Sequence, residues 1–68
     1  MTEPSVGQLE ALVQQRLHGR VHDLRLSVQD DGLILQGRTS TYYAKQLAQH
    51  AAMEVSGLPI LANEIEVR

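Results

Sequence analysis

The chain has 68 residues, with six Lys or Arg, eight Asp or Glu and a formal net charge of −2 at pH 7. This balance argues against non-specific nucleic-acid binding, which needs a basic surface to neutralise phosphates, and the absence of cysteine excludes disulfides and thiolate metal sites. So short a chain forms one domain and buries about 60% of its unfolded surface. We expect a core within residues 5–67 and disorder in residues 1–4.

The N-terminal part of the chain predicts an amphipathic helix. Ser5 followed by Gln8 fits a capping box. Apolar residues then recur at helical spacing: Val6, Leu9, Leu12, Val13 and Leu17. The helix should end at His18, with Gly19 as its left-handed cap.

Two runs in which apolar and polar residues alternate predict an antiparallel hairpin. The runs cover residues 24–29 and 33–38. Asp31-Gly32 should supply the turn, because glycine reaches positive φ without steric cost. Gly37 should let the chain turn sharply as the second strand ends. The aliphatic side chains expected on the inner face are Leu24, Leu26, Val28, Leu33 and Leu35.

A second helix and a third strand complete the chain. The helix should run from about Thr41 to Ser56 with an alanine-rich apolar stripe, and Gly57 should follow its end. Pro59 should stand at the entry of the strand, because proline cannot donate to a ladder. The strand's predicted inner residues are Leu61, Asn63, Ile65 and Val67.

These elements predict the α+β class, as an αββαβ two-layer sandwich. Both helices should cover one face of a three-stranded mixed sheet, and the other face should be exposed to solvent. The helix between the second and third strands suits a right-handed parallel crossover.

Several stretches resemble the BON domain, a family named for bacterial osmotic-stress and nodulation proteins. The strand motif is residues 33–37, which end in Gly37, and the closing motif is residues 57–67, which contain Asn63. The resemblance covers Leu9 to Val67. It implies structural roles for Gly32, Gly37, Gly57 and Asn63. It also implies a non-catalytic module that binds phospholipid or a cell-envelope component, or mediates contacts between proteins.

No pattern in the chain predicts catalysis, a cofactor or a small-molecule substrate. His18 and His22 are four residues apart, but Gly19 interrupts the helix and no third ligand is near, so we expect no metal site. The N-terminus lacks a basic segment followed by an apolar one, so it is not a secretory signal. As given, the chain is expected in the cytoplasm. If it is an excised domain, it is expected in the periplasm or envelope.

Two surfaces are candidates for contact with a ligand or partner. Arg38, Tyr42 and Lys45 group an amphipathic ring with two cations, as suits a lipid headgroup, whereas Tyr43 should pack on the core. Ile34 and Ile60 should be aliphatic residues on the uncovered face of the sheet. The first hypothesis is phospholipid or envelope binding. The alternative is a protein-interaction or self-association module that uses the uncovered face.

Overall fold

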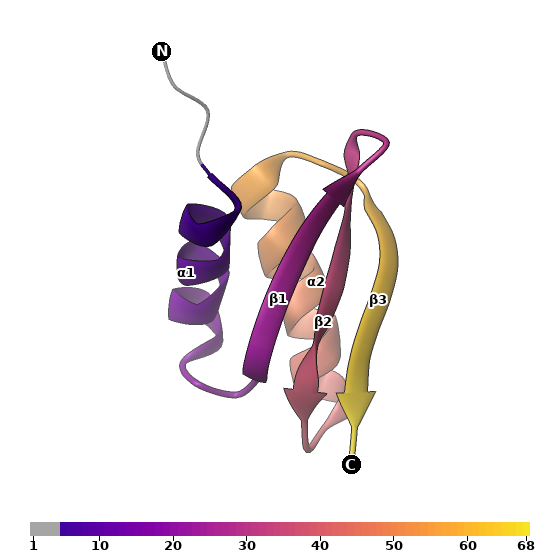
Figure 1. Ribbon diagram of the computed structural model, residues 1–68. Coiled ribbons are helices and arrows are strands. Elements are labelled where there is room, and N and C mark those ends of the chain that lie inside the picture. The colour runs from indigo at the N-terminus through magenta and orange to yellow at the C-terminus, as the bar shows by residue number, and fades with distance from the viewer. Residues whose placement is uncertain (1–4) are drawn as a thin grey trace.

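The computed structural model describes residues 5–68, so the prediction of disorder in residues 1–4 lies outside the described residues. The elements follow in the order α1 (Val6–Leu17), β1 (His22–Gln29), β2 (Gly32–Thr39), α2 (Tyr42–Ser56) and β3 (Ile60–Val67) (Figure 1). The predicted α+β class and αββαβ order are confirmed.

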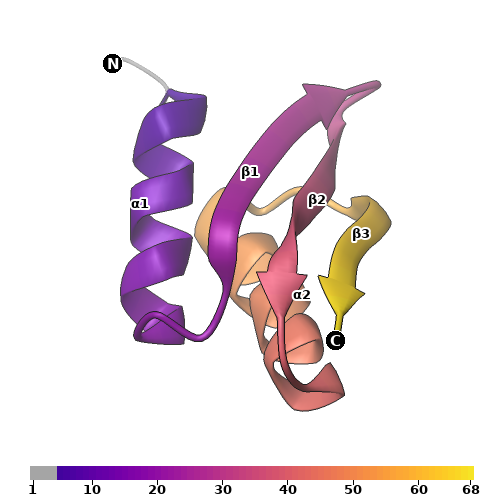
Figure 2. The same cartoon turned by 60° about the horizontal axis from the view of Figure 1, so that its bottom comes forward.

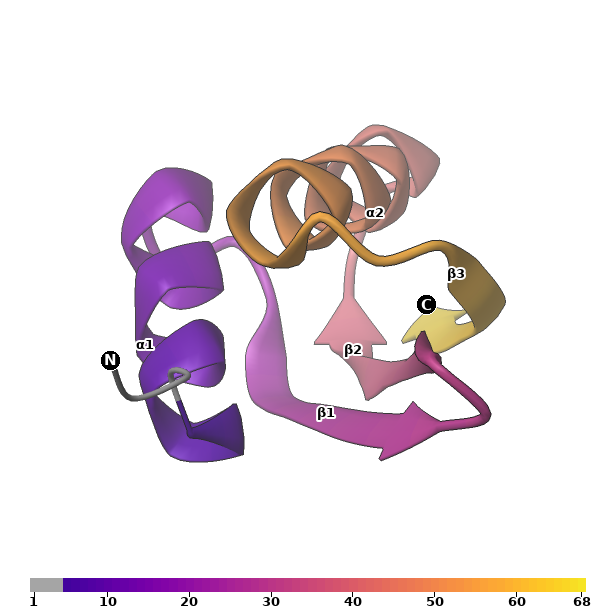
Figure 3. The ribbon, with the colours of Figure 1, turned by 90° about the horizontal axis from the view of Figure 1, so that it is seen from above.

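The three strands form one mixed sheet in the order β1-β2-β3. β1 pairs with β2 antiparallel, and β2 pairs with β3 parallel through the α2 crossover. Both helices pack against the sheet, α2 against β2 and β3, and α1 against β1 and α2. Views from two further directions show α1 beside β1 and α2 across the sheet (Figures 2 and 3). We call the other side of the sheet, which no described element covers, the open face.

The helix termini are fixed by local hydrogen bonds. The predicted capping box is present: Ser5 Oγ accepts from the Gln8 N–H at 3.2 Å, and Gln8 Oε1 accepts from the Ser5 N–H at 2.9 Å. The left-handed cap of α1 is His18, with φ 53°, rather than Gly19 as predicted; Gly19 follows it with φ 78°. The left-handed segment therefore starts one residue earlier than the glycine indicates.

The core lies between the sheet and the helices. It consists of aliphatic side chains from every element and four alanines of α2, whose small size lets that helix lie close to the strands. Its largest fully buried side chains are Leu17, Leu33, Leu35, Ile65, Val13 and Val21. The predicted inner faces of β1 and β2 are correct except at Val28, which is 48% exposed.

The β1–β2 turn differs from the prediction. Its two central residues are Asp30 and Asp31, with φ 47° and 62°, and Gly32 already belongs to β2. Positive φ at both positions fits a type I′ turn, and aspartate tolerates that region better than most residues. Gly32 has another role. A Cβ there would lie 2.5 Å from Leu61 Cγ, so glycine leaves room for that side chain.

Because of a β-bulge at the start of β3, one residue that was predicted to lie on the open face does not lie there. Leu33 pairs with Ile60 and Ile34 pairs with Ala62, so Leu61 is an extra residue on the β3 side. Ile60 consequently packs against the core and does not lie on the open face as predicted. Leu61, predicted to face inward, is 51% exposed. Beyond the bulge the predicted alternation holds, with Ile65 fully buried.

Gly37 lies inside β2, which continues to Thr39, so it does not mark the end of the strand as predicted. It faces a second bulge, in β1, where the register shifts between His22 and Arg25. A Cβ on Gly37 would lie 3.0 Å from Val21 Cγ1 and 3.1 Å from the His22 carbonyl oxygen. Glycine is needed there because β1 approaches too closely for a side chain.

Candidate functional site

Four segments that are distant in sequence meet where β2 and β3 end (Figure 1). They are the α1–β1 loop, the β2–α2 junction, the first turn of α2 and the residue after β3. Together with the last residues of β2, these segments carry four of the six Lys and Arg residues and both tyrosines. We call this group the basic end: Arg20, Arg38, Lys45, Arg68, Tyr42 and Tyr43. The opposite end of the sheet carries the Asp30-Asp31 turn, which we call the hairpin end.

Thr39 holds these segments together. Its side chain is buried and its Oγ1 donates to the Arg20 carbonyl oxygen at 2.8 Å. Its own carbonyl oxygen accepts from the Arg68 N–H at 3.0 Å. The α1–β1 loop and the end of β3 are thus both attached to the last residue of β2, which fixes Arg20 and Arg68 at one end of the sheet.

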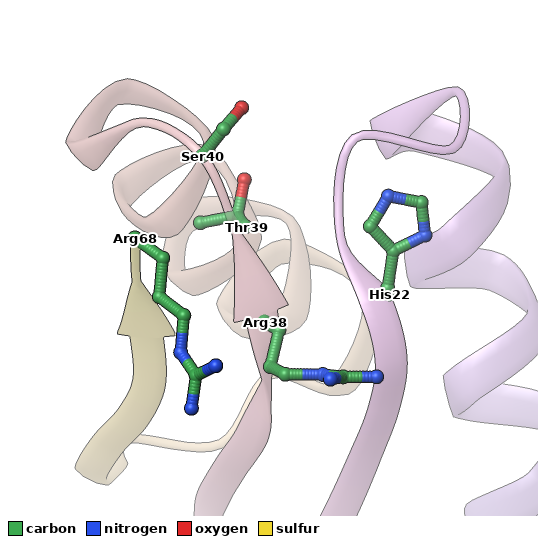
Figure 4. Close-up of a pocket in the computed structure, with 5 residues that line it drawn as sticks. All are labelled: His22, Arg38, Thr39, Ser40 and Arg68. Atoms are coloured by element: carbon green, nitrogen blue, oxygen red, sulfur yellow. The ribbon is translucent and has the colours of Figure 1, made fainter.

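Two open cavities lie side by side at the basic end. The first, of about 350 Å³, is lined by His22, Arg38, Thr39, Ser40 and Arg68 (Figure 4). The second, of about 410 Å³, is lined by Gly19, Arg20, His22, Thr39, Ser40, Thr41, Tyr43 and Ala44. In Figure 4 the Arg38 side chain extends across β2 toward β1, and Arg68 lies on the β3 side. The shared lining at His22, Thr39 and Ser40 makes the two cavities one concave, cation-rich surface.

The charges of the basic end are only partly balanced. Arg38 forms an ion pair with Asp23, and Arg68 forms one with Glu66 at 3.0 Å. These pairs are exposed, so each contributes only about 0.2–1 kcal/mol and can open toward a ligand. Within residues 5–68, Arg20 and Lys45 have no ion-pair partner. The surface therefore keeps a local positive charge although the chain is net negative.

The predicted group of Arg38, Tyr42 and Lys45 is only partly assembled. Lys45 Nζ lies 6.0 Å from the centroid of the Tyr42 ring, and Tyr42 is 71% exposed. Arg38 instead turns onto the open face toward Asp23. The prediction that Tyr43 packs on the core is wrong, because this side chain is 66% exposed. The buried stripe of α2 runs through alanines 44, 48, 51 and 52, and Tyr43 lies beside it.

The open face has two charged rows and one apolar row. The charged row nearest the basic end is Asp23, Arg38 and Glu66. Arg25, Gln36 and Glu64 are cross-strand neighbours, and Gln36 Nε2 donates to Glu64 Oε1 at 3.1 Å. Arg25 has no hydrogen-bond or ion-pair partner for its guanidinium in the described part of the chain. The next row toward the hairpin end is Ser27, Ile34 and Ala62. Ile34 is half-buried there, and the exposed Leu61 follows.

Asn63 connects β3 with the first turns of α2. Its Nδ2 donates to the Lys45 carbonyl oxygen at 3.0 Å and to Gln49 Oε1 at 3.3 Å. Its Oδ1 accepts from the Ile65 N–H at 3.2 Å. Asn63 thus joins β3 to α2 by side-chain hydrogen bonds. Gly57, with φ 70°, is the left-handed cap of α2, a conformation that glycine adopts most easily.

Two searches of the described residues bear on metal and membrane sites. Among residues 5–68 no group of three or more His, Cys, Asp or Glu side chains is close enough to hold a metal ion. No helix in this range has both the length and the apolar character needed to cross a membrane.

Comparisons with family models, curated proteins and solved structures found no match to this chain.

Proposed function

We propose that this chain is a non-catalytic binding module whose basic end binds anionic phospholipid headgroups. The observation that carries the proposal is the gathering of Arg20, Lys45 and two exposed tyrosines beside a concave surface. The geometry also favours binding over catalysis. The cavities are open, and the buried Thr39 hydroxyl beside them donates to the Arg20 carbonyl oxygen.

Local charge outweighs net charge in such an interaction. Each Lys or Arg held against an anionic bilayer contributes about 1 kcal/mol, and this attraction decays within a Debye length of about 8–10 Å. A strand of eight residues spans roughly 26 Å, so Asp30 and Asp31 at the hairpin end lie beyond this range. The bilayer therefore interacts with the cations of the basic end and is little affected by the distant carboxylates.

The tyrosines and the family resemblance support the same ligand. Tyrosine is enriched at membrane–water interfaces, where its apolar ring contacts the lipid and its hydroxyl contacts water. Tyr42 and Tyr43 are both largely exposed beside Lys45 and Arg20. The BON resemblance also implies phospholipid among the ligands of this class of module.

The test is co-sedimentation with vesicles of phosphatidylcholine alone or mixed with phosphatidylglycerol. We expect binding to the mixed vesicles only. Arg20→Glu should lower the affinity for these vesicles by at least about tenfold, since a cation at the surface is replaced by an anion. Arg16→Glu is the matched control. It changes the net charge equally, but Arg16 pairs with Glu54 on the helix layer.

Three results would contradict the proposal. They are equal sedimentation with both vesicle types, no sedimentation with either, and equal losses in Arg20→Glu and Arg16→Glu. The last result would show that net charge, rather than the basic end, governs the interaction.

A further inference from the structure

We infer that Asp23 is an autoinhibitory residue, which binds Arg38 on the open face and so withholds this cation from the headgroup site at the basic end. This regulation rests on the proposed function, because it concerns the affinity of the same site. The ligand is the phosphate of an anionic headgroup, which Arg38 contacts only after it leaves Asp23.

Arg38 lies at the border between the basic end and the open face. It lines the basic-end cavity of about 350 Å³ beside Ser40 and Arg68. It also lines a hollow of about 520 Å³ on the open face beside Asp23. Its guanidinium lies on the β1 side of β2, whereas Arg68 lies on the β3 side (Figure 4). One long side chain can therefore serve either surface, and the ion pair with Asp23 holds it on the open face.

Asp23 lies in the β-bulge of β1, in a conformation that favours glycine. The register of β1 against β2 shifts between His22 and Arg25, and Asp23 has φ 55°. Glycine usually occupies a left-handed bulge position, and other residues held in such a conformation cluster at functional sites. Asp23 lacks the freedom of glycine but supplies a carboxylate, which accepts from Arg38. The bulge therefore carries a charge that a glycine would not provide.

The second ion pair of the basic end does not withhold its arginine. Arg68 binds Glu66 at 3.0 Å and still lines the basic-end cavity. Of these two residues, Glu66 is the one that lines the open-face hollow. Arg68 thus remains at the headgroup site while it is paired, and Asp23 is the carboxylate that holds a cation on the other surface.

The pair of Asp23 and Arg38 is weak enough for a membrane to open it. The Arg38 and Asp23 side chains are 55% and 70% exposed, and an exposed pair shifts an equilibrium by up to about fivefold. The attraction of one cation to an anionic bilayer is also worth about fivefold. Because the two effects are similar in size, the density of anionic lipid decides which contact Arg38 makes.

Co-sedimentation of Asp23→Asn with vesicles tests the autoinhibition. Asparagine tolerates positive φ but lacks the charge, so we expect the affinity for phosphatidylcholine–phosphatidylglycerol vesicles to rise about two- to fivefold. Asp23→Gly, which also suits the bulge, should give the same gain. Glu54→Gln is the matched control, because it removes one negative charge and releases Arg16 on the helices. An equal gain in this control would overturn the inference.

Arg38→Gln separates the release of Arg38 from the simple loss of a carboxylate near the bilayer. If Asp23 withholds Arg38, this substitution should lower the affinity by a factor about two to five times larger in the Asp23→Asn background than in the wild type. If Asp23 only repels the bilayer, the factor should be the same in both backgrounds. Equal factors would therefore overturn the inference.

The fraction of anionic lipid gives a further readout. A strongly charged bilayer draws Arg38 away from Asp23 in the wild type, whereas a weakly charged one does not. We therefore expect the gain from Asp23→Asn to be largest at a low fraction of phosphatidylglycerol and to shrink as this fraction rises. A gain that does not depend on the fraction would contradict competition between Asp23 and the bilayer for Arg38.

A nuclear magnetic resonance measurement without lipid tests the pair itself. The Arg38 Nε–Hε signal should shift between the wild type and Asp23→Asn, and the Arg16 signal should not. An unchanged Arg38 signal would show that the pair does not form in solution and would overturn the inference. Vesicle binding by the wild type without a gain in Asp23→Asn would contradict the autoinhibition alone. If neither protein binds vesicles, the proposed function is contradicted and the autoinhibition falls with it.

Discussion

The two ends of the sheet are built in different ways. The hairpin end is local: Gln29 and Gly32 pair across a turn of two aspartates, Asp30 and Asp31. The basic end is assembled from four segments separated by up to about two thirds of the chain, and the buried Thr39 binds two of them through hydrogen bonds. The hairpin end is acidic because its turn consists of two neighbouring aspartates. The basic end is cationic because the fold brings together Lys and Arg residues that are distant in sequence.

This difference shows why the net charge of this chain is a poor guide to the charge of any one of its surfaces. The net charge of −2 combines an acidic turn and a cationic end that lie at opposite ends of the strands (Figure 1). A binding surface senses charges within about one Debye length, so the distribution matters more than the sum.

The largest expected effect comes from the core that holds the two ends in place. Leu35 is fully buried in β2, so Leu35→Ala should lower the free energy of unfolding by 2–5 kcal/mol, measured by urea denaturation. Ile34→Ala, on the open face of the same strand, should cost about 1 kcal/mol or less because Ile34 is half-buried. Equal losses at the two positions would contradict the assignment of the faces.

A smaller effect is expected from Gly37, beside the basic end. Gly37→Ala places a Cβ 3.1 Å from the His22 carbonyl oxygen, and we expect a loss of about 1–3 kcal/mol in urea denaturation because β1 must move. Gly7→Ala is the control, since a Cβ there meets nothing closer than 3.9 Å. It should raise stability by up to about 1 kcal/mol, because alanine is the better helix former. No loss in Gly37→Ala would show that the β1 bulge is not fixed.

The smallest effect is expected at the hairpin end. Asp31 has φ 62°, and Asp31→Gly creates an Asp-Gly pair, which is favoured in type I′ turns. Thermal denaturation should show a gain of less than about 1 kcal/mol. Vesicle binding should not change, because this end lies far from the proposed contact. Stronger binding in this variant would show that the acidic turn repels the bilayer and that the two ends do not act separately.

Much of the fold was predictable because its signals are periodic and local. The helical spacing in α1, the alternation around Leu26 and Leu35, and the cap at Ser5 are read directly from neighbouring residues, and the structure confirms them. Right-handed crossover chirality then favoured a parallel β2–β3 pair, which is also confirmed.

The errors arise where a position depends on distant residues. The bulge at Leu61 moves Ile60 to the core, and period-two alternation contains no signal for an extra residue. Gly32 and Gly37 were assigned to turns, whereas the structure shows them meeting Leu61 and β1 at close range. In each case the partner comes from another element of the sheet.

The candidate site was only partly predictable for the same reason. Tyr42 and Lys45 are three residues apart on one helix, so their contact could be predicted. Arg20 and Arg68 were missed because they are far apart in the sequence. Their proximity could have been inferred from the strand directions. Arg20 precedes β1 and Arg68 follows β3, and the antiparallel β1–β2 and parallel β2–β3 pairings bring these two positions to the same end of the sheet.

The most direct test of the proposed function is an amide chemical-shift titration with bicelles. The labelled chain is titrated with zwitterionic bicelles and then with bicelles that contain anionic lipid. We expect shifts only with anionic lipid, concentrated at Arg20, Tyr42, Tyr43 and Lys45, while the amides of Asp30 and Asp31 remain unchanged. An unchanged spectrum, or shifts centred on the hairpin end, would contradict lipid binding at the basic end.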